Sequence, residues 1–544
     1  MCGFRAHQGK GLSPDFDHMV IEVSGIGDSN CHPYLNMTAT SQGGEKAVFY
    51  NKLLAKKIQK CYNKMNNYPL EGCVLEQKTT VITQEQLAIQ QEACEKIFAY
   101  WKDREIRPVA FVDTYGCQQN EADSERIRGM LSACGYDMTD KEEGADIIVL
   151  NTCAIREHAE QRVFGNVGAL THTKRRHPRQ KIFLCGCMMG QPKVSDRIKH
   201  SYPHVDGVFS THHLWEFPSL LLRVLTTGKR VFAVADEAGS IAENIPVLRT
   251  NKLKAWVSVM YGCNNFCSYC IVPYVRGRER SRQPEDIIKE CKEVIAAGYK
   301  EITLLGQNVN SYGKDLGLGI DFADLMEQVA QLEGDFRLRF MTSHPKDASK
   351  KLFDTIARYP KICKQFHLPF QSGNDRVLKV MNRRYTSAQY LELVDYGRSL
   401  MPDLVLTSDV IVGFPGETEE EFEDTLKLIE RVRYDALFTF IYSPRGGTPA
   451  AVMEDPTPKA EKNRRFDRLV DLQNRISEEI HRSYIGKTVT VLVDGRDGDN
   501  LTSRTDGGRL VRFPGEDSLI GQFTDVTITA CTTWSLMGEL KSDT

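Results

Sequence analysis

Three closely spaced cysteines could hold an iron–sulfur cluster. Cys263, Cys267 and Cys270 have the spacing C-x3-C-x2-C and follow an apolar, strand-like run over 255–260. Three thiolates from one short loop suit a cubic four-iron cluster whose fourth iron keeps an open position. In this spacing the expected ligand of the open iron is S-adenosylmethionine, which an electron from the cluster cleaves to a deoxyadenosyl radical. The loop therefore predicts a radical generator.

Two other roles are open to cysteines in such a loop. Structural zinc sites are usually built from paired cysteine elements that supply four ligands, whereas this loop has three, unevenly spaced, with no fourth nearby. Cysteines can also be buried as small, inert hydrophobic residues. Three within eight residues are unusual for that role, so the pattern favours the cluster.

A second set of cysteines follows the strands of a predicted open α/β sheet. Strand candidates at 108–112, 146–150 and 181–184 alternate with helix candidates at 121–134 and 159–173. Cys117, Cys153 and Cys187 each come just after one of these strands. Because ligands bind at the carboxyl ends of such strands, we expect the three to meet in a second metal site. Each could instead merely cap a buried strand, and Cys185 is an alternative ligand.

Strand and helix candidates alternate again after residue 249. Strands are predicted at 256–260, 301–305, 337–341, 365–368, 404–412 and 436–442, with helices such as 284–297 and 387–400 between them. Six such units predict an incomplete parallel barrel, (βα)6, with an opening at its side for a macromolecular substrate. Polar, glycine-containing loops follow the strands, and Gln307 and Asn308 in one of them are candidate contacts to S-adenosylmethionine.

The remaining motifs point to RNA. Arg276, Arg278, Arg280 and Arg282 follow the radical loop, and a second basic run covers 174–179. Such runs are often solvated surface, but arginines beside a radical site would hold phosphates well. After a charged helix at 459–481, strand candidates at 487–493, 501–505, 510–512, 525–530 and 536–540 predict a small, OB-like β-barrel. That fold often binds RNA, although a purely structural cap is the alternative.

The composition indicates the cellular compartment but does not identify a binding partner. The 544 residues include 70 Lys and Arg against 72 Asp and Glu, a net charge of −2, so any nucleic-acid surface must be local. No apolar run is long enough for a membrane span, and residues 1–10 have no apolar core of a signal peptide. We therefore expect a cytoplasmic protein, in which those of the 16 cysteines that are clustered are metal ligands rather than disulfides.

About four fifths of the chain resembles a known family. The segments 151–168 and 260–282 are similar to those of the radical-SAM methylthiotransferases. The resemblance implies an α/β methylthiotransferase domain at 106–228, a radical-SAM core at 249–482 and a TRAM domain at 484–544. Residues 1–105, with a lysine-rich helix candidate near 51–66, fall outside it and form an extension of unknown role.

The resemblance also implies the chemistry. Cys263, Cys267 and Cys270 would hold the radical 4Fe-4S cluster, and Cys117, Cys153 and Cys187 an auxiliary 4Fe-4S cluster. S-adenosylmethionine would serve both as methyl donor and as radical source in methylthiolation of C2 of N6-isopentenyladenosine at position 37 in the tRNA anticodon loop. We expect a monomer that depends on an electron donor of flavodoxin or ferredoxin type and on iron–sulfur assembly proteins.

Three alternatives share this architecture. One sister activity modifies threonylcarbamoyladenosine in tRNA, but it would not be expected to show the Ala-Ile-Arg-Glu-His run that follows Cys153. Another modifies an aspartate of a ribosomal protein. The third is an iron–sulfur RNA-binding protein without turnover, which the two intact cysteine sets disfavour.

Overall fold

The computed structural model describes residues 3–8, 19–24, 80–154, 157–234 and 239–541. The chain divides into two compact units, Met1–Lys78 and Thr79–Thr544. The described part of the first unit is an antiparallel pair of strands, β1 (Gly3–Gln8) and β2 (Met19–Ser24). The helix predicted near 51–66 lies outside the described residues. No helix in the described ranges is both long and apolar enough to cross a membrane.

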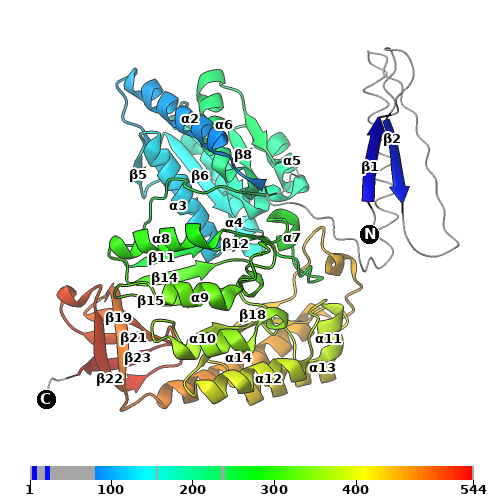
Figure 1. The fold of residues 1–544 in the computed structure, drawn as a ribbon, viewed down its shortest axis with the longest axis vertical. Helices are drawn as coiled ribbons and strands as arrows, with labels where there is room; N and C mark the ends of the chain where they lie inside the picture. The colour runs from blue at the N-terminus through cyan, green and yellow to red at the C-terminus, as the bar shows by residue number, and fades with distance from the viewer. Residues whose placement is uncertain (1–2, 9–18, 25–79, 155–156, 235–238, 542–544) are drawn as a thin grey trace. The chain divides into compact units, whose positions relative to one another are not determined.

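The second unit begins with the predicted open α/β sheet. Six parallel strands have the order β5-β4-β6-β7-β8-β9 (Figure 1). They are β4 (Val109–Thr114), β5 (Asp137–Thr139), β6 (Ile147–Thr152), β7 (Lys181–Gly186), β8 (Gly207–Phe209) and β9 (Val231–Ala233). Every residue of β6 is buried, because helices cover both faces of a parallel sheet.

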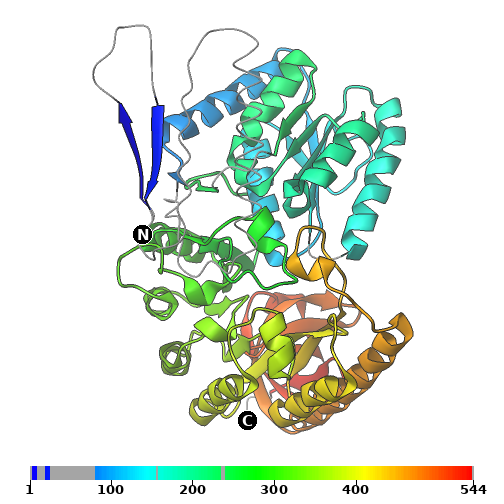
Figure 2. The same ribbon diagram turned by 90° about the vertical axis from the view of Figure 1, so that its right-hand side faces the viewer.

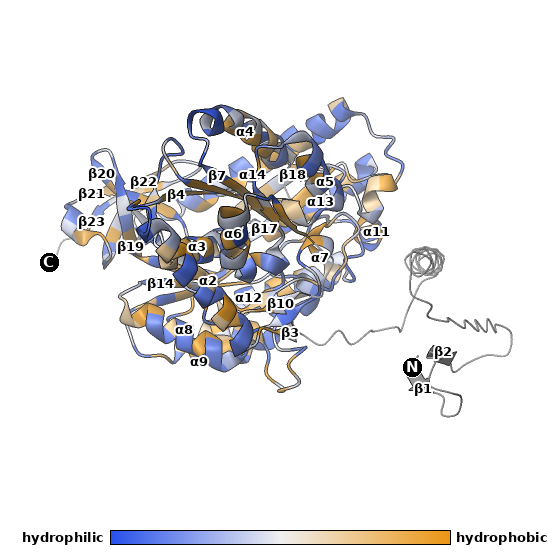
Figure 3. Ribbon diagram, turned by 90° about the horizontal axis from the view of Figure 1, so that it is seen from above, coloured by the Kyte–Doolittle hydropathy of each residue, from blue (hydrophilic) through white to orange (hydrophobic). Residues whose placement is uncertain are grey.

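Alternate residues of these strands enter two different cores. Ile147, Val149 and Phe183 pack with α2 (Gln84–Lys102), α3 (Gln118–Ala133) and α6 (Phe217–Thr227). The residues between them, such as Ile148, pack with α4 (Glu157–Arg176) and α5 (Pro192–Ser201) on the other face. Figure 3 shows the resulting apolar strands between helices with hydrophilic outer faces.

Helix α2 lies within the predicted N-terminal extension but packs on the α/β sheet. Thr83 and Gln86 form a capping box that fixes its start, because each side chain accepts a hydrogen bond from the other residue's backbone N–H. Ile97 and Trp101 are buried in the same core as α3 and α6. The domain boundary at residue 105 stays a prediction.

The predicted incomplete barrel follows. It consists of two three-stranded parallel sheets, β11-β14-β15 and β16-β17-β18, joined by a bridge between Leu338 and Ile362. The strands are β11 (Lys254–Ser258), β14 (Glu301–Leu305), β15 (Arg337–Phe340), β16 (Gln365–His367), β17 (Val405–Val412) and β18 (Ala436–Ile441). No pairing of β11 with β18 is recorded among the described residues, so the barrel stays open between its first and last strands.

Helices surround the outside of this barrel. They are α8 (Pro284–Ala296), α9 (Phe322–Ala330), α10 (Lys350–Arg358), α11 (Asp375–Val380), α12 (Ser387–Leu400) and α13 (Glu419–Val432). The long helix α14 (Lys459–Arg482) packs beside α13 and against β18 (Figures 1 and 2). This core contains aromatic pairs such as Phe353 stacked on Phe366, with ring centroids 4.8 Å apart.

The C-terminal strands close into the predicted small barrel. Its order is β19-β20-β21-β23-β22, from β19 (Thr488–Asp497), β20 (Asn500–Thr505), β21 (Leu510–Pro514), β22 (Phe523–Cys531) and β23 (Leu536–Leu540). Arg339 on β15 joins it to the incomplete barrel. Its guanidinium donates to the carbonyls of Thr505 (2.9 Å) and Asp506 (2.7 Å). Glu301 accepts a third hydrogen bond from Arg339, so this buried charge is paired.

Candidate functional site

The radical loop is held by a short antiparallel pair. Strand β12 (Met260–Tyr261) enters the loop and β13 (Arg280–Ser281) leaves it, with α7 (Val272–Val275) between. Gly262 has φ +77°, and a Cβ there would lie 2.0 Å from the carbonyl oxygen of Arg278. Only glycine fits such a close backbone approach. The Gly262 N–H also donates to the side chain of Gln307.

The loop presents its three thiols in a buried, polar setting. Cys263 and Cys267 are less than a tenth exposed. Burial raises the pKa of Cys263 to about 12, and burial with the two neighbouring thiols raises that of Cys270 further above its usual range. The thiolates that ligate iron therefore need nearby positive charge. Arg383, itself buried, supplies it: Nη1 lies 3.5 Å from Sγ of Cys267.

The second cysteine set meets at one edge of the α/β sheet. Cys117 caps α3 just after β4, Cys153 follows β6, and Cys187 begins the short helix η1 (Cys187–Gly190) directly after β7. Because β4, β6 and β7 are parallel neighbours, their carboxyl ends lie together. A Cβ on Gly116 would lie 2.8 Å from Sγ of Cys153, which shows how closely the loops approach.

A guanidinium from the radical domain reaches this second set. Burial raises the pKa of Cys187 to about 12, and the charge of Arg276 opposes that rise while Cys117 and Cys153 add to it. Nε of Arg276 donates to Sγ of Cys187 at 2.9 Å. Nη2 donates to Oδ1 of Asn120 (2.7 Å) and to Oδ2 of Asp123 (2.8 Å). Arg276 follows α7, six residues after Cys270, so one side chain links the two cysteine sets.

Neither cysteine set converges on a single point in the described part of the chain. In the part of the chain that the structure describes, no three His, Cys, Asp or Glu side chains are placed to hold one metal ion. A four-iron cluster binds each cysteine at a different corner, so its ligands surround a volume and need not converge on a point. Cys185 does not join the second set, because it packs in the apolar core with Phe183.

Several buried oxygens beside the radical loop have no hydrogen-bond partner among the described residues. Asn308 is 1% exposed and donates to Asp347 at 2.8 Å, whereas its Oδ1 accepts from no described residue. The oxygens of Ser268, Asn310 and Ser343 are likewise buried without a described partner. Since unpaired buried oxygens are costly, they fit the amine, carboxylate and hydroxyl groups of S-adenosylmethionine. Gln307 accepts from the Gly262 N–H and donates to Gln119 at 3.5 Å, and its contact to S-adenosylmethionine stays a prediction.

Three of the four arginines predicted to contact RNA are inside the protein. Arg276, Arg280 and Arg282 are each less than a tenth exposed. Arg282 pairs with Glu243 (2.6 Å) and Glu290 (2.7 Å), partners that no local pattern in the sequence could reveal. The predicted RNA contact is corrected for these three. The exposed members of the two predicted basic runs are Arg278 in the loop, Arg175 and Arg176 in the last turn of α4, and His177 and Arg179 just after it.

Sequence reasoning missed a group of side chains on the inner face of the barrel. Phe438 and Phe440 are 50% and 40% exposed on β18, on the face away from the helix-packed core. Phe438 pairs in register with Asp409, and His367 lies 3.6 Å from that carboxylate. The sequence signal for this group was two aromatic residues, Phe438 and Phe440, at alternate positions of a predicted strand.

Comparisons with known families divide the chain in the same way. A model of the radical SAM superfamily matches residues 257–429, and a TRAM domain model matches residues 482–541. A model of the uncharacterized protein family UPF0004 matches residues 109–210, which hold Cys117, Cys153 and Cys187.

Curated relatives match almost over their whole length. A tRNA-2-methylthio-N(6)-dimethylallyladenosine synthase from Thermoanaerobacter pseudethanolicus is 49% identical over 462 residues, which is 84% of this chain and 98% of the relative. Enzymes of the same name from Acetivibrio thermocellus and Clostridium perfringens are 48% and 51% identical, covering 86% and 79% of this chain and 98% and 97% of the relatives. The chain belongs to this synthase family.

Membership in the synthase family makes the chain a radical-SAM enzyme, which uses an iron–sulfur cluster and S-adenosylmethionine. Among solved structures, the radical S-adenosylmethionine methyltransferase TsrM from Kitasatospora setae matches at 14% identity with a TM-score of 0.48, covering 64% of this chain and 74% of that chain.

The contacts of Arg276 predict that replacing it strongly lowers the free energy of unfolding. Arg276→Gln leaves the buried carboxylate of Asp123 without its closest cation, which should destabilise the protein by ~3–5 kcal/mol. Arg278→Gln, two residues away and exposed, should cost less than ~1 kcal/mol. Thermal unfolding of the two variants measures the difference, and equal midpoints would contradict the structural role of Arg276.

Proposed function

We propose that this chain methylthiolates tRNA. It places a methylthio group on C2 of N6-dimethylallyladenosine, also called N6-isopentenyladenosine, at position 37, and S-adenosylmethionine is both methyl donor and radical source. The observation that carries the proposal is the meeting of two cysteine sets across Arg276, in a chain about half identical to synthases of that name.

The chemistry explains why two cysteine sets serve one reaction. An adenine C–H bond is too inert for polar substitution, so a radical must activate C2 and a second centre must supply sulfur. When bound, a cluster at Cys263, Cys267 and Cys270 with S-adenosylmethionine supplies the radical, and one at Cys117, Cys153 and Cys187 carries the sulfur. One buried guanidinium lies beside each set, Arg383 at Cys267 and Arg276 at Cys187, where its charge would stabilise a thiolate.

The inner face of the barrel is suited to a flipped purine. Phe438 and Phe440 offer exposed rings for stacking, and His367 and Asp409 offer polar groups beside them. An anticodon-loop base is single-stranded, so turning it out of its stack costs at most a few kcal/mol. We propose that the base reaches this face from the side on which β11 and β18 do not pair among the described residues.

Three surfaces are proposed to hold the rest of the tRNA. The basic end of α4 and Arg278 would attract phosphates. The C-terminal barrel would bind the anticodon stem. Its Trp534, which is 73% exposed, offers a ring on which a base could stack. We further propose that the enzyme is a cytoplasmic monomer with a flavodoxin- or ferredoxin-type electron donor, and that iron–sulfur assembly proteins load it.

Separate roles of the two cysteine sets predict separable defects. Replacing Cys263, Cys267 and Cys270 by alanine should abolish deoxyadenosine formation under anaerobic, reducing conditions. Replacing Cys117, Cys153 and Cys187 should spare deoxyadenosine formation but stop sulfur insertion into tRNA, because only the sulfur-carrying centre is lost. Chromatography of both products tests this. Normal thiolation by the second variant would overturn the auxiliary assignment.

A stacking role of Phe438 predicts a substrate-specific defect. Phe438→Ala should lower kcat/KM for tRNA by roughly 5- to 150-fold, the loss of ~1–3 kcal/mol of base stacking. Deoxyadenosine formation without tRNA should not change. Ile89→Ala, an exposed apolar residue on α2, is the matched control and should leave both rates unchanged. An unaltered kcat/KM in Phe438→Ala would remove this side chain from the substrate site.

A further inference from the structure

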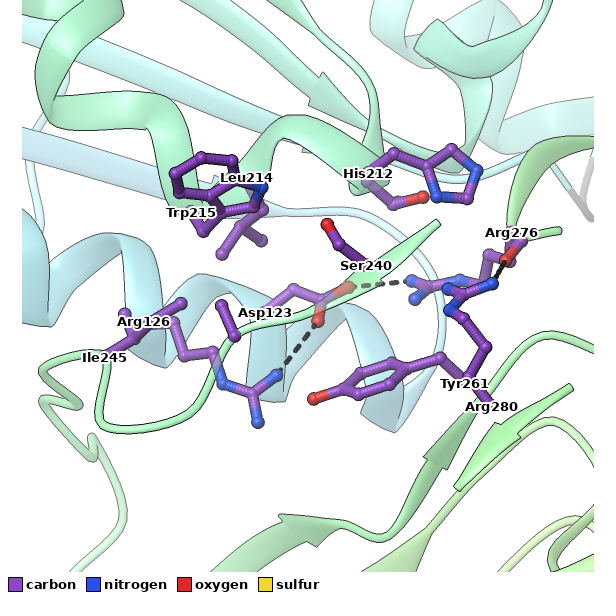
Figure 4. Close-up of a pocket in the computed structure, with 12 residues that line it drawn as sticks. Asp123, Arg126, His212, Leu214, Trp215, Ser240, Ile245, Tyr261, Arg276 and Arg280 are labelled. Carbon is purple, nitrogen blue, oxygen red and sulfur yellow. Dashed lines mark hydrogen bonds and ion pairs between the residues drawn. The ribbon is translucent and has the colours of Figure 1, made fainter. Parts of the chain in front are cut away.

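A small cavity lies where the α/β domain meets the radical domain. Figure 4 shows Asp123 and Arg126 from α3, His212 from the helix η2 (Thr211–Glu216), Tyr261 from β12, and Arg276 and Arg280 around it. The volume is about 40 Å³. The cavity is distinct from the inner face of the barrel. Its lining includes Arg276 and Arg280, two of the buried arginines that are not available to bind RNA.

Positive charge exceeds negative charge around this cavity. Three guanidinium groups line it, those of Arg126, Arg276 and Arg280, and one carboxylate, that of Asp123. Asp123 already pairs with Arg276 at 2.8 Å and with Arg126 at 3.7 Å. Burial, and next the charge of Arg280, lowers the pKa of His212 to about 4, so its imidazole is neutral at pH 7. The lining therefore has a net charge of +2 from three cations and one anion.

Arg280 is the unpaired member of this group. The residue is 7% exposed, and no carboxylate forms an ion pair with it among the described residues. Its Nη1 donates to the carbonyls of Arg276 (3.2 Å) and Arg278 (2.8 Å), while Nε has no partner in the described ranges. Burial, and the neighbouring charge of Arg276, lower the pKa of Arg280 to about 10. A buried cation without a counterion is costly, and an anion in the cavity would offset that cost.

The size of the cavity selects the class of anion. A single water needs about 10–15 Å³ of such volume, so 40 Å³ holds a group about the size of a few waters. A whole nucleotide or S-adenosylmethionine is larger than that, whereas a small inorganic anion fits.

We propose that this cavity is a binding site for a small inorganic monoanion, of the size of chloride, bromide or hydrosulfide, held by the guanidinium of Arg280. The cavity is one side chain away from the auxiliary cysteines, because Arg276 lines it and also donates to Sγ of Cys187 at 2.9 Å. The anion class follows from the cavity alone. A link to sulfur supply, through hydrosulfide, rests on the proposed function.

Bromide is the probe, because its anomalous scattering locates it directly. Crystals of the cluster-loaded full chain grown with sodium bromide should show an anomalous peak in the cavity, within hydrogen-bond reach of Arg280. Arg280→Gln should lose the peak, and so should Ser240→Leu, which fills the cavity without removing a charge if the first variant fails to fold. Arg278→Gln, in the same loop but outside the lining, should keep it.

The outcomes separate the proposal from its alternatives. No peak in the wild-type cavity, or an undiminished peak in both Arg280→Gln and Ser240→Leu, would overturn the anion site and leave water as the occupant. Titration of bromide-loaded crystals with chloride or with sodium sulfide then identifies the natural ligand: displacement by either supports the site, and resistance to both overturns it. None of these readouts depends on turnover, so failure of the tRNA proposal would be recognised separately.

Discussion

The contact between Arg276 and the auxiliary cysteines is the interaction on which the site depends. Thiolates buried at the edge of a sheet repel one another and lose hydration, so they require a cation nearby. Arg276 comes from the segment that carries the radical cysteines, yet it donates to Cys187, Asn120 and Asp123 of the other domain. The same hydrogen bonds that stabilise the second cysteine set therefore also fix its position relative to the first.

The folds on either side explain why the cysteines are available for this contact. Parallel strands end at one edge, so three cysteines from distant parts of the chain meet after β4, β6 and β7. The radical cysteines instead come from one loop, which the β12–β13 pair closes. Phe438 and Phe440 on β18 are exposed, and the C-terminal barrel is fixed to β15 through Arg339.

Much of this architecture could be predicted from local patterns. Apolar runs gave the bounds of β14 and α12 to the residue, because periodicity and caps act over a few neighbours. Both cysteine sets were grouped from their positions after strands. The prediction for the arginine run is wrong because such a run normally marks a surface, whereas Arg282 pairs with Glu243, far away in the sequence, and with Glu290 on α8. Burial of a charge depends on such tertiary partners, which no local pattern contains.

The central claim is that one chain holds two clusters, one in each cysteine set. Iron content and Mössbauer spectra of the anaerobically reconstituted full chain test it most directly. Two four-iron clusters predict about eight irons per chain, and about four when Cys117, Cys153 and Cys187 are replaced by alanine. About four irons in the unaltered chain, or no loss of iron in that variant, would contradict the account.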